Sequence, residues 1–284
     1  MPELPEVETI VRGLRPLLEG QTFTQVRTYA PATSIVVSKS FRQRRLNSLL
    51  RGRTVLRIDR RGKNILIALS GDITLWVHLK MTGRLLAVPQ SAPKDKHDLV
   101  LFDLDSNRSP SEFTHIRFND YRRFGRLRLF PNDELWQQDG LRDLGPEPLE
   151  ISADDFVALC HTRTRMIKPA LLDQSFIAGI GNIYADEALY LSRIHPARVT
   201  SSISRGKLAE LHRRIQDVLK RSIESMGTTV ISYAGVDGAS GSFQNQLLVY
   251  GREGEACGVC GTKIVREKLG ARSAHFCPRC QRQP

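Results

Sequence analysis

Two CxxC pairs near the C-terminus constrain the fold of this chain more than any other feature of its sequence. Cys257 and Cys260 form the first pair, and Cys277 and Cys280 form the second pair after sixteen intervening residues. Such pairs at this spacing are typical of a four-cysteine zinc ribbon, in which four thiolates complete a tetrahedral shell around one Zn²⁺. A complete shell leaves no position for a substrate, so we expect a structural metal. A redox-active pair is the alternative.

The cysteine count also indicates the compartment. The chain has five cysteines, and the one outside the pairs, Cys160, lies in an apolar helical context typical of a core residue. An odd number of cysteines, with four in metal-binding pairs, favours a reducing compartment over disulfide bonds. The sequence has no run of eighteen apolar residues and no basic stretch before an apolar one at the N-terminus. We therefore expect a cytoplasmic protein without export or membrane insertion.

The chain is strongly basic. Its 284 residues include 42 Lys and Arg against 30 Asp and Glu, which gives a formal charge of +12 and a pI near 9.8. This excess favours nucleic acid as the partner, although a merely basic soluble protein would show the same charge. Basic residues also occupy the segment between the two cysteine pairs, which predicts that this hairpin contacts nucleic acid. They are Lys263, Arg266, Lys268, Arg272 and His275.

Apolar periodicity predicts a helix and then a set of strands in the first 131 residues. The helix extends from about Val7 to Leu18, before Gly20, and Pro16 is expected to kink it or end it early. Short runs that alternate apolar and polar residues follow, without long helices between them, and they favour an antiparallel sandwich in an α+β protein. The eight runs are TFTQVRTYA, TVLRID, NILIAL, ITLWVHL, RLLAV, DLVLFDL, HIRF and RLRLF.

The remainder of the chain divides into a linker, a helical region and the cysteine hairpin. We predict a sandwich domain over residues 1–131, a Pro- and Gly-rich linker over 132–150, a helical domain over 151–246 and the hairpin over 247–284. A Gly- and Ser-rich loop, Ser232–Asn245, is a candidate lid. The expected helices are roughly Ala153–His161, Asn182–Ser192 and Ser204–Met226.

The N-terminus contains a candidate nucleophile. If Met1 is removed, Pro2 presents a secondary amine, and an α-amino group titrates near pH ~8, so part of it is unprotonated at neutral pH. Such an amine condenses with an aldehyde-like carbon to give an iminium, and Glu3 is the nearest candidate for the proton transfers. The alternative is that Glu3, Glu6 and Glu8 are first-turn acids that complement the helix dipole.

The segment PELPEVETIVRGL closely resembles the N-terminus of bacterial formamidopyrimidine-DNA glycosylases, and the resemblance extends from Pro2 to Cys280. It implies that Pro2 is the catalytic nucleophile and Glu3 the acid/base, with Glu6 as a weaker supporting candidate. The opening PELPEVET, in place of a PEGPE-type start, favours this family over the related endonuclease VIII. The family fold is a β-sandwich followed by a helix-two-turns-helix domain and a zinc ribbon.

The resemblance assigns roles in the sandwich domain. Lys63, in the turn RRGK, matches a β-hairpin lysine that reaches the phosphate and the lesion and that we group with the catalytic residues. In HLKMTG, His78 is a candidate DNA contact and Met81 matches the residue that enters the space left by an extruded base. A solvated turn and a core methionine are the alternatives.

Further positions of the family pattern lie in the loop DYRRFG and in the helical domain. Arg122 matches the arginine that pairs with the orphaned base and Phe124 matches the wedge, whereas Tyr121 replaces a small or proline-like residue. In IKPALLDQSFIAGIGNIYADEALY, Lys168 and Asn182 match phosphate-binding residues, although Asn182 alone would be a helix N-cap. Arg272 matches a phosphate-binding arginine, which we also group with the catalytic residues.

These observations predict a monomeric, bifunctional DNA glycosylase and AP lyase that acts on duplex DNA with oxidised purines or abasic sites. Two alternatives remain open. The first is an endonuclease VIII-like enzyme for oxidised pyrimidines, with the Gly- and Ser-rich loop as the determinant. The second is a non-catalytic protein that binds damaged DNA through its zinc ribbon and basic faces, a function that does not require the Pro2-Glu3 start.

Overall fold

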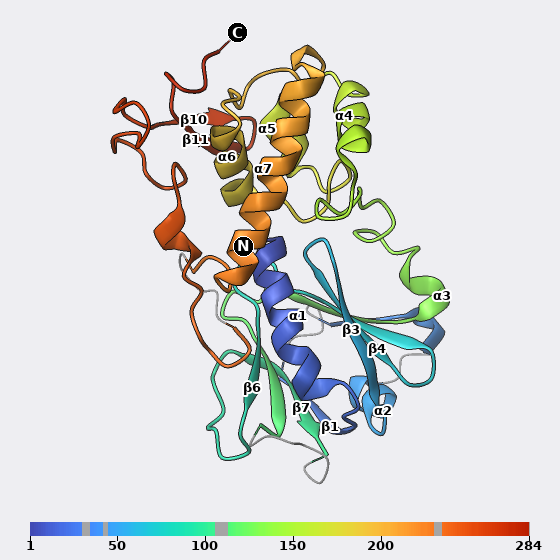
Figure 1. Cartoon of the computed structure of the whole chain (residues 1–284). Helices are drawn as coiled ribbons and strands as arrows, with labels where there is room; N and C mark the ends of the chain where they lie inside the picture. The colour runs from blue at the N-terminus through green and yellow to red at the C-terminus, as the bar shows by residue number, and fades with distance from the viewer. Residues whose placement is uncertain (30–34, 42–44, 106–112, 230–234, 284) are drawn as a thin grey trace. The chain divides into compact units, whose positions relative to one another are not determined.

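The computed structural model describes residues 1–29, 35–41, 45–105, 113–229 and 235–283 (Figure 1). The chain forms two compact units. The first consists of Met1–Arg142 together with Met226–Ser242, and the second consists of Asp143–Ser225 together with Phe243–Pro284. Residues Met226–Ser242 therefore belong to the unit that contains the N-terminus. The division predicted from the sequence placed them in the helical domain instead.

Helix α1 (Leu4–Leu18) opens the first unit. Glu3 is its N-cap, and its buried face contains Val7, Ile10 and Leu14 at helical spacing. The helix continues two residues beyond Pro16, so the expected early end did not occur. Pro16 lies in the last turn and has no N–H to donate. The turn is closed instead by Glu19, whose N–H donates to Arg15 O at 3.0 Å.

The two sheets of the first unit contain all eight predicted strands and one more. The strand orders are β1-β7-β8-β6 and β2-β9-β5-β4-β3, and every pairing is antiparallel except that of β2 with β9. The additional strand β2 has three residues, too few to show an alternating pattern in sequence. The strands are β1 (Phe23–Thr28), β2 (Ile35–Val37), β3 (Val55–Arg61), β4 (Asn64–Leu69), β5 (Ile73–His78), β6 (Arg84–Val88), β7 (Asp98–Leu104), β8 (His115–Asn119) and β9 (Arg126–Pro131).

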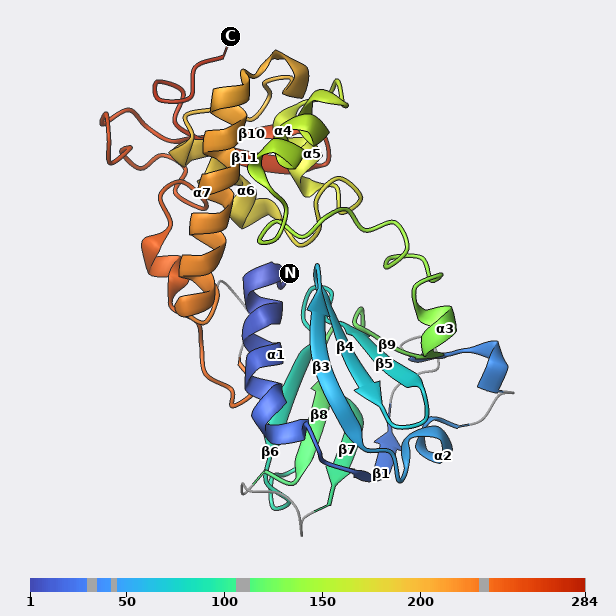
Figure 2. The ribbon, with the colours of Figure 1, turned by 45° about the vertical axis from the view of Figure 1, so that its right-hand side comes forward.

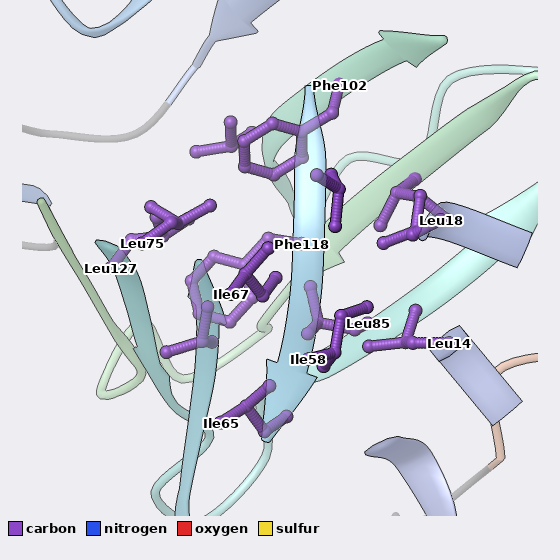
Figure 3. Close-up of a cluster of buried hydrophobic side chains, with 14 of the residues drawn as sticks. Leu14, Leu18, Ile58, Ile65, Ile67, Leu75, Leu85, Phe102, Phe118 and Leu127 are labelled. Carbon is purple, nitrogen blue, oxygen red and sulfur yellow. The ribbon is translucent and has the colours of Figure 1, made fainter. Parts of the chain in front are cut away.

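Apolar residues of α1 and of both sheets form one core. Figure 3 shows Leu14 and Leu18 of α1 in one cluster with Ile58 of β3 and Phe118 of β8, and all four side chains are buried. Helix α1 lies along β3 in both ribbon views (Figure 1 and Figure 2). Arg15 Nε donates to Ile58 O at 2.9 Å, and Ile58 N–H donates to Glu19 Oε1 at 2.9 Å. The helix that follows Pro2 and Glu3 is therefore fixed to the sandwich.

The second unit contains four helices and the cysteine hairpin among its described residues. These are α4 (Ala153–His161), α5 (Ile167–Leu172), α6 (Asn182–Leu191), α7 (Arg205–Glu224), β10 (Val265–Leu269) and β11 (Arg272–Phe276). The three predicted helices correspond to α4, α6 and α7. Helix α5 and, in the first unit, α2 (Leu46–Leu50) and α3 (Asn132–Leu135) were not predicted, because helices of four to six residues show no amphipathic period. Single-turn 3₁₀ segments occur at Lys39–Phe41, Thr200–Ser202 and Phe243–Gln246.

Side chains of the second unit attach the hairpin segment to α6. Both carboxylate oxygens of buried Glu187 accept backbone N–H groups, from Leu248, Val249 and Tyr250, each at 2.9 Å. Gln281 is fully buried and donates to Ile194 O at 2.9 Å. Within the described residues, none of the helices has the length and apolar character that a membrane crossing requires.

Candidate active site and nucleic-acid interface

The N-terminal residues are held by a buried carboxylate. Glu6 Oε2 accepts the N–H of Glu3 at 2.8 Å, and Glu6 Oε1 accepts the N–H of Thr228 at 2.8 Å. The Glu3 side chain in turn accepts the N–H of Glu6, which completes a capping box. Pro2 is buried, and Glu3 and Glu6 are only 4% and 2% exposed. Both acids are therefore buried at the start of α1, which they cap, and Glu6 fixes the backbone next to Pro2.

A second acid of α1 connects the helix to the turn that contains Lys63. Glu8 Oε2 accepts from Arg60 Nε at 2.9 Å, and Arg60 Nη1 donates to Gly62 O at 3.1 Å. Burial acts to raise the pKa of Glu8, but hydrogen bonds and positive charges from Arg12 and Arg60 outweigh it and hold that pKa below its usual value. Glu8 is therefore ionised at neutral pH and binds the turn to the helix that follows Pro2.

The turn itself is tightly defined. Gly62 has φ +56°, which glycine readily adopts at the first central position of a two-residue hairpin between Arg61 and Asn64. The buried Asn64 side chain donates to Arg61 O at 2.9 Å and accepts from Trp76 Nε1 at 2.8 Å. Lys63 is only 5% exposed, so the alternative of a solvated basic turn is wrong for this side chain.

His78, at the end of β5, is neutral at physiological pH. Burial lowers the pKa of His78 to about 3, and the positive charges of Lys80, Lys63 and Arg128 act in the same direction. Its Nδ1 accepts the N–H of Lys80 at 3.0 Å. A neutral imidazole has one N–H, so the proton is on Nε2, and His78 offers a single uncharged donor.

The side chains expected to enter the DNA stack are exposed. Met81 and Phe124 are 38% and 46% exposed and Arg122 is also exposed, so Met81 is not a core residue. The neighbouring Tyr121 is 47% exposed. The Arg122 guanidinium lies over the Phe124 ring, 4.6 Å from its centroid. Tyr121, the departure from the family pattern, contacts the His97 ring edge to face at a centroid distance of 6.1 Å.

In the second unit, Lys168 is part of a buried network. Its Nζ donates to Asp186 Oδ1 and to the backbone oxygen of Ser273, both at 2.5 Å. Asp186 Oδ2 accepts the N–H of His275 at 2.9 Å and lies 3.1 Å from His275 Nδ1. Lys168 is 1% exposed and Asp186 is also 1% exposed. The network joins α5 and α6 to strand β11, which begins at Arg272.

Asn182 is not the N-cap of α6. Gly181 is the N-cap and Asn182 the first helical residue, and the cap residue makes no side-chain hydrogen bond. Asn182 Oδ1 is buried and has no hydrogen-bond partner among the described residues. The preceding turn is organised by Gln174, which donates to Ile180 O at 2.9 Å and accepts the N–H of Gly179 at 3.0 Å. The Asn182 side chain is therefore not committed to capping.

The four paired cysteines fit one zinc ion. Their sulfur atoms all lie within 4.8 Å of one another, with 3.9 Å between Cys257 and Cys280 and 3.5 Å between Cys260 and Cys277. Zn–S bonds of about 2.3 Å in a tetrahedron place sulfur atoms ~3.8 Å apart, whereas a disulfide needs about 2.05 Å. The metal is a structural zinc, because four thiolates complete its shell. This set does not support the redox alternative.

Tyr190 of α6 lies next to a zinc-binding cysteine, and Arg272 lies on the hairpin between the two cysteine pairs. Tyr190 O–H lies 3.1 Å from Cys257 Sγ, and burial raises the pKa of Tyr190, so the hydroxyl is protonated and donates to the thiolate. Arg272 is exposed at the start of β11 and follows the tight turn at Gly270, which has φ +63°.

The remaining cysteine, Cys160, is fully buried in the core as predicted, and burial raises its pKa to about 12.

Several residues that position the site were not predicted from the sequence. Thr228, Asp120, Thr82, Asp186 and Gln174 all make buried or partly buried hydrogen bonds to site segments. Thr82, Asp120, Gln174 and Asp186 lie inside the motifs HLKMTG, DYRRFG and IKPALLDQSFIAGIGNIYADEALY. Each was a polar residue to which no role had been assigned, and this was a signal that could have found them. Thr228 gave no comparable signal.

Three domain families match the chain in order. The formamidopyrimidine-DNA glycosylase N-terminal domain matches residues 1–127, the H2TH domain of the same glycosylase matches 144–233, and a zinc finger found in FPG and IleRS matches 254–283. The fold and the site thus define a zinc-finger protein of the H2TH glycosylase class. The chain belongs to the formamidopyrimidine-DNA glycosylase family.

Individual relatives agree with this assignment. Formamidopyrimidine-DNA glycosylases of Pediococcus pentosaceus and Lactiplantibacillus plantarum are each 43% identical to the chain, over 99% of it and over 99% and 100% of their own lengths. A Lactococcus lactis FPG variant in complex with Fapy-dG containing DNA is similar in structure, with a TM-score of 0.88 and 33% identity over 99% of this chain and 100% of that chain. A Lactococcus lactis Fpg complex with abasic-site DNA has a TM-score of 0.87 and 32% identity over the same shares.

Proposed function

We propose that this protein is a bifunctional DNA glycosylase and AP lyase that removes oxidised purines, such as 8-oxoguanine and formamidopyrimidines, from duplex DNA. The observation that carries the proposal is the buried Pro2-Glu3 start in a chain of this family. Glu6 holds that start through two backbone amides. The Lactococcus lactis relatives bound to Fapy-dG and abasic-site DNA support the same substrates.

In the proposed reaction, the Pro2 amine exposed by removal of Met1 attacks C1′ of the damaged nucleotide. The C1′–N bond breaks, the base leaves with a proton, and the sugar ring opens to an iminium on Pro2. The iminium withdraws electrons and allows loss of a proton from C2′, after which β- and δ-elimination release the two phosphates. Glu3 transfers protons in these steps, and Glu6 keeps the backbone beside the amine in place.

Other residues hold the DNA. A base inside a duplex is out of reach, so the nucleotide must be extruded and the gap filled, for which we propose Met81, Arg122 and Phe124. Lys63 and the neutral His78 donate to phosphate in the first unit, and Lys168, Asn182 and Arg272 contribute phosphate contacts in the second. Lys63 and Arg272 also assist the elimination steps, because their positive charges stabilise the negative charge on the departing phosphates.

Several further features belong to this proposal. The zinc ion supplies no step and keeps the hairpin that contains Arg272 folded. A monomeric state and a cytoplasmic location fit a bacterial enzyme that acts on the chromosome. The predicted domains are kept in this proposal, except that residues 226–242 group with the first unit. The lid role of Ser232–Asn245 stays a prediction, since residues 232–234 lie outside the described part. Within the described part, Val236 is buried in the first unit and its O accepts the N–H of Ala87 at 2.8 Å.

Borohydride trapping on an 8-oxoguanine duplex tests the proposal. Reduction of the iminium should crosslink the protein to the DNA, and mass spectrometry of the crosslinked peptide should identify Pro2. A variant with one residue inserted before Pro2 should lose the crosslink and keep duplex binding, whereas the same insertion after Pro284 is the matched control. Trapping that persists in the N-terminally extended variant would exclude Pro2.

The same assay distinguishes the alternatives. A Lactococcus lactis Fpg has been solved with DNA that contains an oxidised pyrimidine, so a second duplex should contain such a base. Faster trapping on the pyrimidine duplex would favour endonuclease VIII-like specificity. Binding without any trapping or strand cleavage would indicate a non-catalytic damage-binding protein.

A further inference from the structure

Two loops of the first unit lie side by side at one end of the sandwich. The Met81 loop (residues 79–83) connects β5 to β6, and the wedge loop (residues 120–125) connects β8 to β9. Strand β5 pairs with β9 through His78 and Arg126, and β6 pairs with β8 through Arg84 and Asn119. Each loop therefore crosses from one sheet to the other. The residue before each loop pairs with the residue after the other loop, which holds the two loops next to each other.

One buried carboxylate connects the two loops. Asp120 is fully buried, and its Oδ1 accepts the hydroxyl of Thr82 in the Met81 loop. The same carboxylate accepts the N–H of Arg122 at 3.1 Å and that of Gly125 at 2.7 Å within the wedge loop. The hydrogen bond from Thr82 therefore connects the Met81 loop to the Asp120 carboxylate, which shapes the wedge loop.

The backbone of both loops has little freedom to adjust. A Cβ at Gly83 would lie 2.6 Å from Leu79 O, and a Cβ at Gly125 would lie 2.6 Å from the Phe118 ring and 3.0 Å from Asp120 Oδ2. Arg123 has φ +58°, a conformation that few non-glycine residues adopt. The surroundings hold this conformation, and the Asp120 hydrogen bonds are part of them.

We propose that Thr82 and Asp120 are positioning residues that couple the two loops, so that Met81, Arg122 and Phe124 enter the duplex as one preorganised unit. The proposal rests on the proposed function, because it concerns the extrusion step of that reaction. If the two loops were independent, each would have to be ordered separately when the DNA binds. The hydrogen bond between them removes part of that entropic cost before binding.

The central prediction is an effect that passes from one loop to the other. Thr82→Val removes the hydroxyl and keeps the side-chain shape, whereas Thr82→Ser keeps the hydroxyl and is the matched control. We expect Thr82→Val to slow 8-oxoguanine release from duplex by about tenfold more than strand cleavage at an abasic site, the loss expected for one hydrogen bond to a charged group. Thr82→Val should also reduce discrimination between opposite bases, which depends on Arg122 in the other loop. Thr82→Ser should behave as the wild type.

Single-turnover rates on both duplexes, with each opposite base, provide the test. The Met81→Ala effect should be smaller in the Thr82→Val background than in the wild type, because uncoupled loops already lose part of the Met81 contribution. Equal slowing of both reactions, unchanged opposite-base discrimination or strictly additive effects would overturn the coupling. If Thr82→Val unfolds, Thr82→Ala serves in its place, with the thermal midpoint measured for each variant. A wild-type protein that releases no base would instead reject the proposed function itself.

Discussion

The buried carboxylates that contact the candidate DNA-binding segments have different partners in the two units. In the first unit, Glu6 and Asp120 accept backbone amides, and Asp120 organises the loops from which the exposed side chains of Met81, Arg122 and Phe124 project. In the second unit, Asp186 binds Lys168 directly, so a residue expected to contact phosphate is itself buried. The first arrangement separates support from contact, and the second combines them in one side chain.

This difference predicts how substitutions behave. Removing an exposed side chain of the first unit should change DNA handling with little effect on folding, whereas removing Lys168 should change both. Both tryptophans, Trp76 and Trp136, lie in the first unit. Tryptophan fluorescence therefore reports unfolding of the first unit, and the far-UV helical signal reports mainly the helices of the second unit.

The largest expected effect comes from the zinc site and is confined to the second unit. Cys277→Ser leaves three thiolates, and binding of structural zinc contributes about 10–16 kcal/mol in small zinc-finger peptides. We expect elemental analysis to fall from one zinc per chain to none, and duplex affinity to fall because the hairpin loses its frame. The tryptophan unfolding midpoint should change little.

Cys160→Ala is the control, since Cys160 lies in the core outside the metal site and its loss should leave one zinc per chain. Full zinc content in the Cys277→Ser protein would contradict the four-cysteine site. A tryptophan midpoint that fell as far as the helical signal would contradict the confinement of the effect.

Lys168→Ala should have the next largest effect. It removes the cationic partner of a buried carboxylate, and breaking such a pair costs about 3–5 kcal/mol. We expect the helical signal to be lost at lower urea concentration, together with weaker binding to damaged and undamaged duplex alike. Lys168→Met combined with Asp186→Asn keeps an acceptor for His275 without a buried charge, so it should recover stability and not affinity.

Arg272→Ala is the matched comparison. Arg272 of the second unit is also expected to contact phosphate, but its side chain is exposed. It should change the free energy of unfolding by no more than about 0.5 kcal/mol. It should lower the slope of log affinity against log salt by about 0.9 for one lost phosphate contact. If Lys168→Ala were as stable as Arg272→Ala, the contrast between the two units would be wrong.

The sequence predicted the parts of this fold that leave a local signal. Eight strands, four helices (α1, α4, α6 and α7) and the zinc site follow from alternation, helical period and CxxC spacing, each within a short stretch of chain. The supporting contacts could not be predicted in this way. Glu6 and Thr228 are separated by 222 residues, Asp186 and His275 by 89, and Thr82 and Asp120 by 38. A hydrogen bond between two such residues imposes no periodicity on the sequence.

The candidate site shows the same limit. The resemblance indicated Lys63 and Lys168 as contacts, but neither residue pattern nor charge indicated that both side chains are buried. Burial depends on what the rest of the chain places around a residue. For Asn182, the local pattern favoured an N-cap, and the structure shifts the cap by one residue to Gly181, which has no side chain to compete with a ligand.

A smaller, selective effect is expected from the exposed side chains of the first unit. Phe124→Ala and Met81→Ala should slow 8-oxoguanine release from duplex more than strand cleavage at an abasic site, where no base has to be unpaired. Arg122→Ala should also reduce discrimination between opposite bases. Single-turnover rates on the two duplexes measure both effects. The free energy of unfolding, followed by tryptophan fluorescence, should stay within about 0.5 kcal/mol of the wild-type value.

These variants separate support from contact only if the two reactions respond differently. Equal slowing of base release and abasic cleavage in all three variants would mean that the side chains take part in the chemistry or in folding. A large loss of stability in Phe124→Ala would place that ring in the core, despite its 46% exposure.

The smallest expected effect concerns His78 and the pH dependence of stability in the first unit. Burial lowers the pKa of His78 in the folded state to about 3, whereas an unfolded histidine titrates near ~6.5. Between these values the unfolded state binds the extra proton, so stability rises with pH across the window. The contribution is fully present above pH ~6.5 and is lost as pH falls towards 3.

His78→Gln removes this titration, so its stability should decrease less than that of the wild type between pH 7 and pH 5. The expected difference is about 1–2 kcal/mol, since one proton can contribute at most ~1.4 kcal/mol per pH unit. Urea unfolding followed by tryptophan fluorescence at both pH values measures it in the unit that contains His78. Other titrating groups are common to both proteins and cancel in the comparison. Equal pH dependence in the two proteins would mean that His78 is not held neutral, and its assignment as an uncharged phosphate donor would then be wrong.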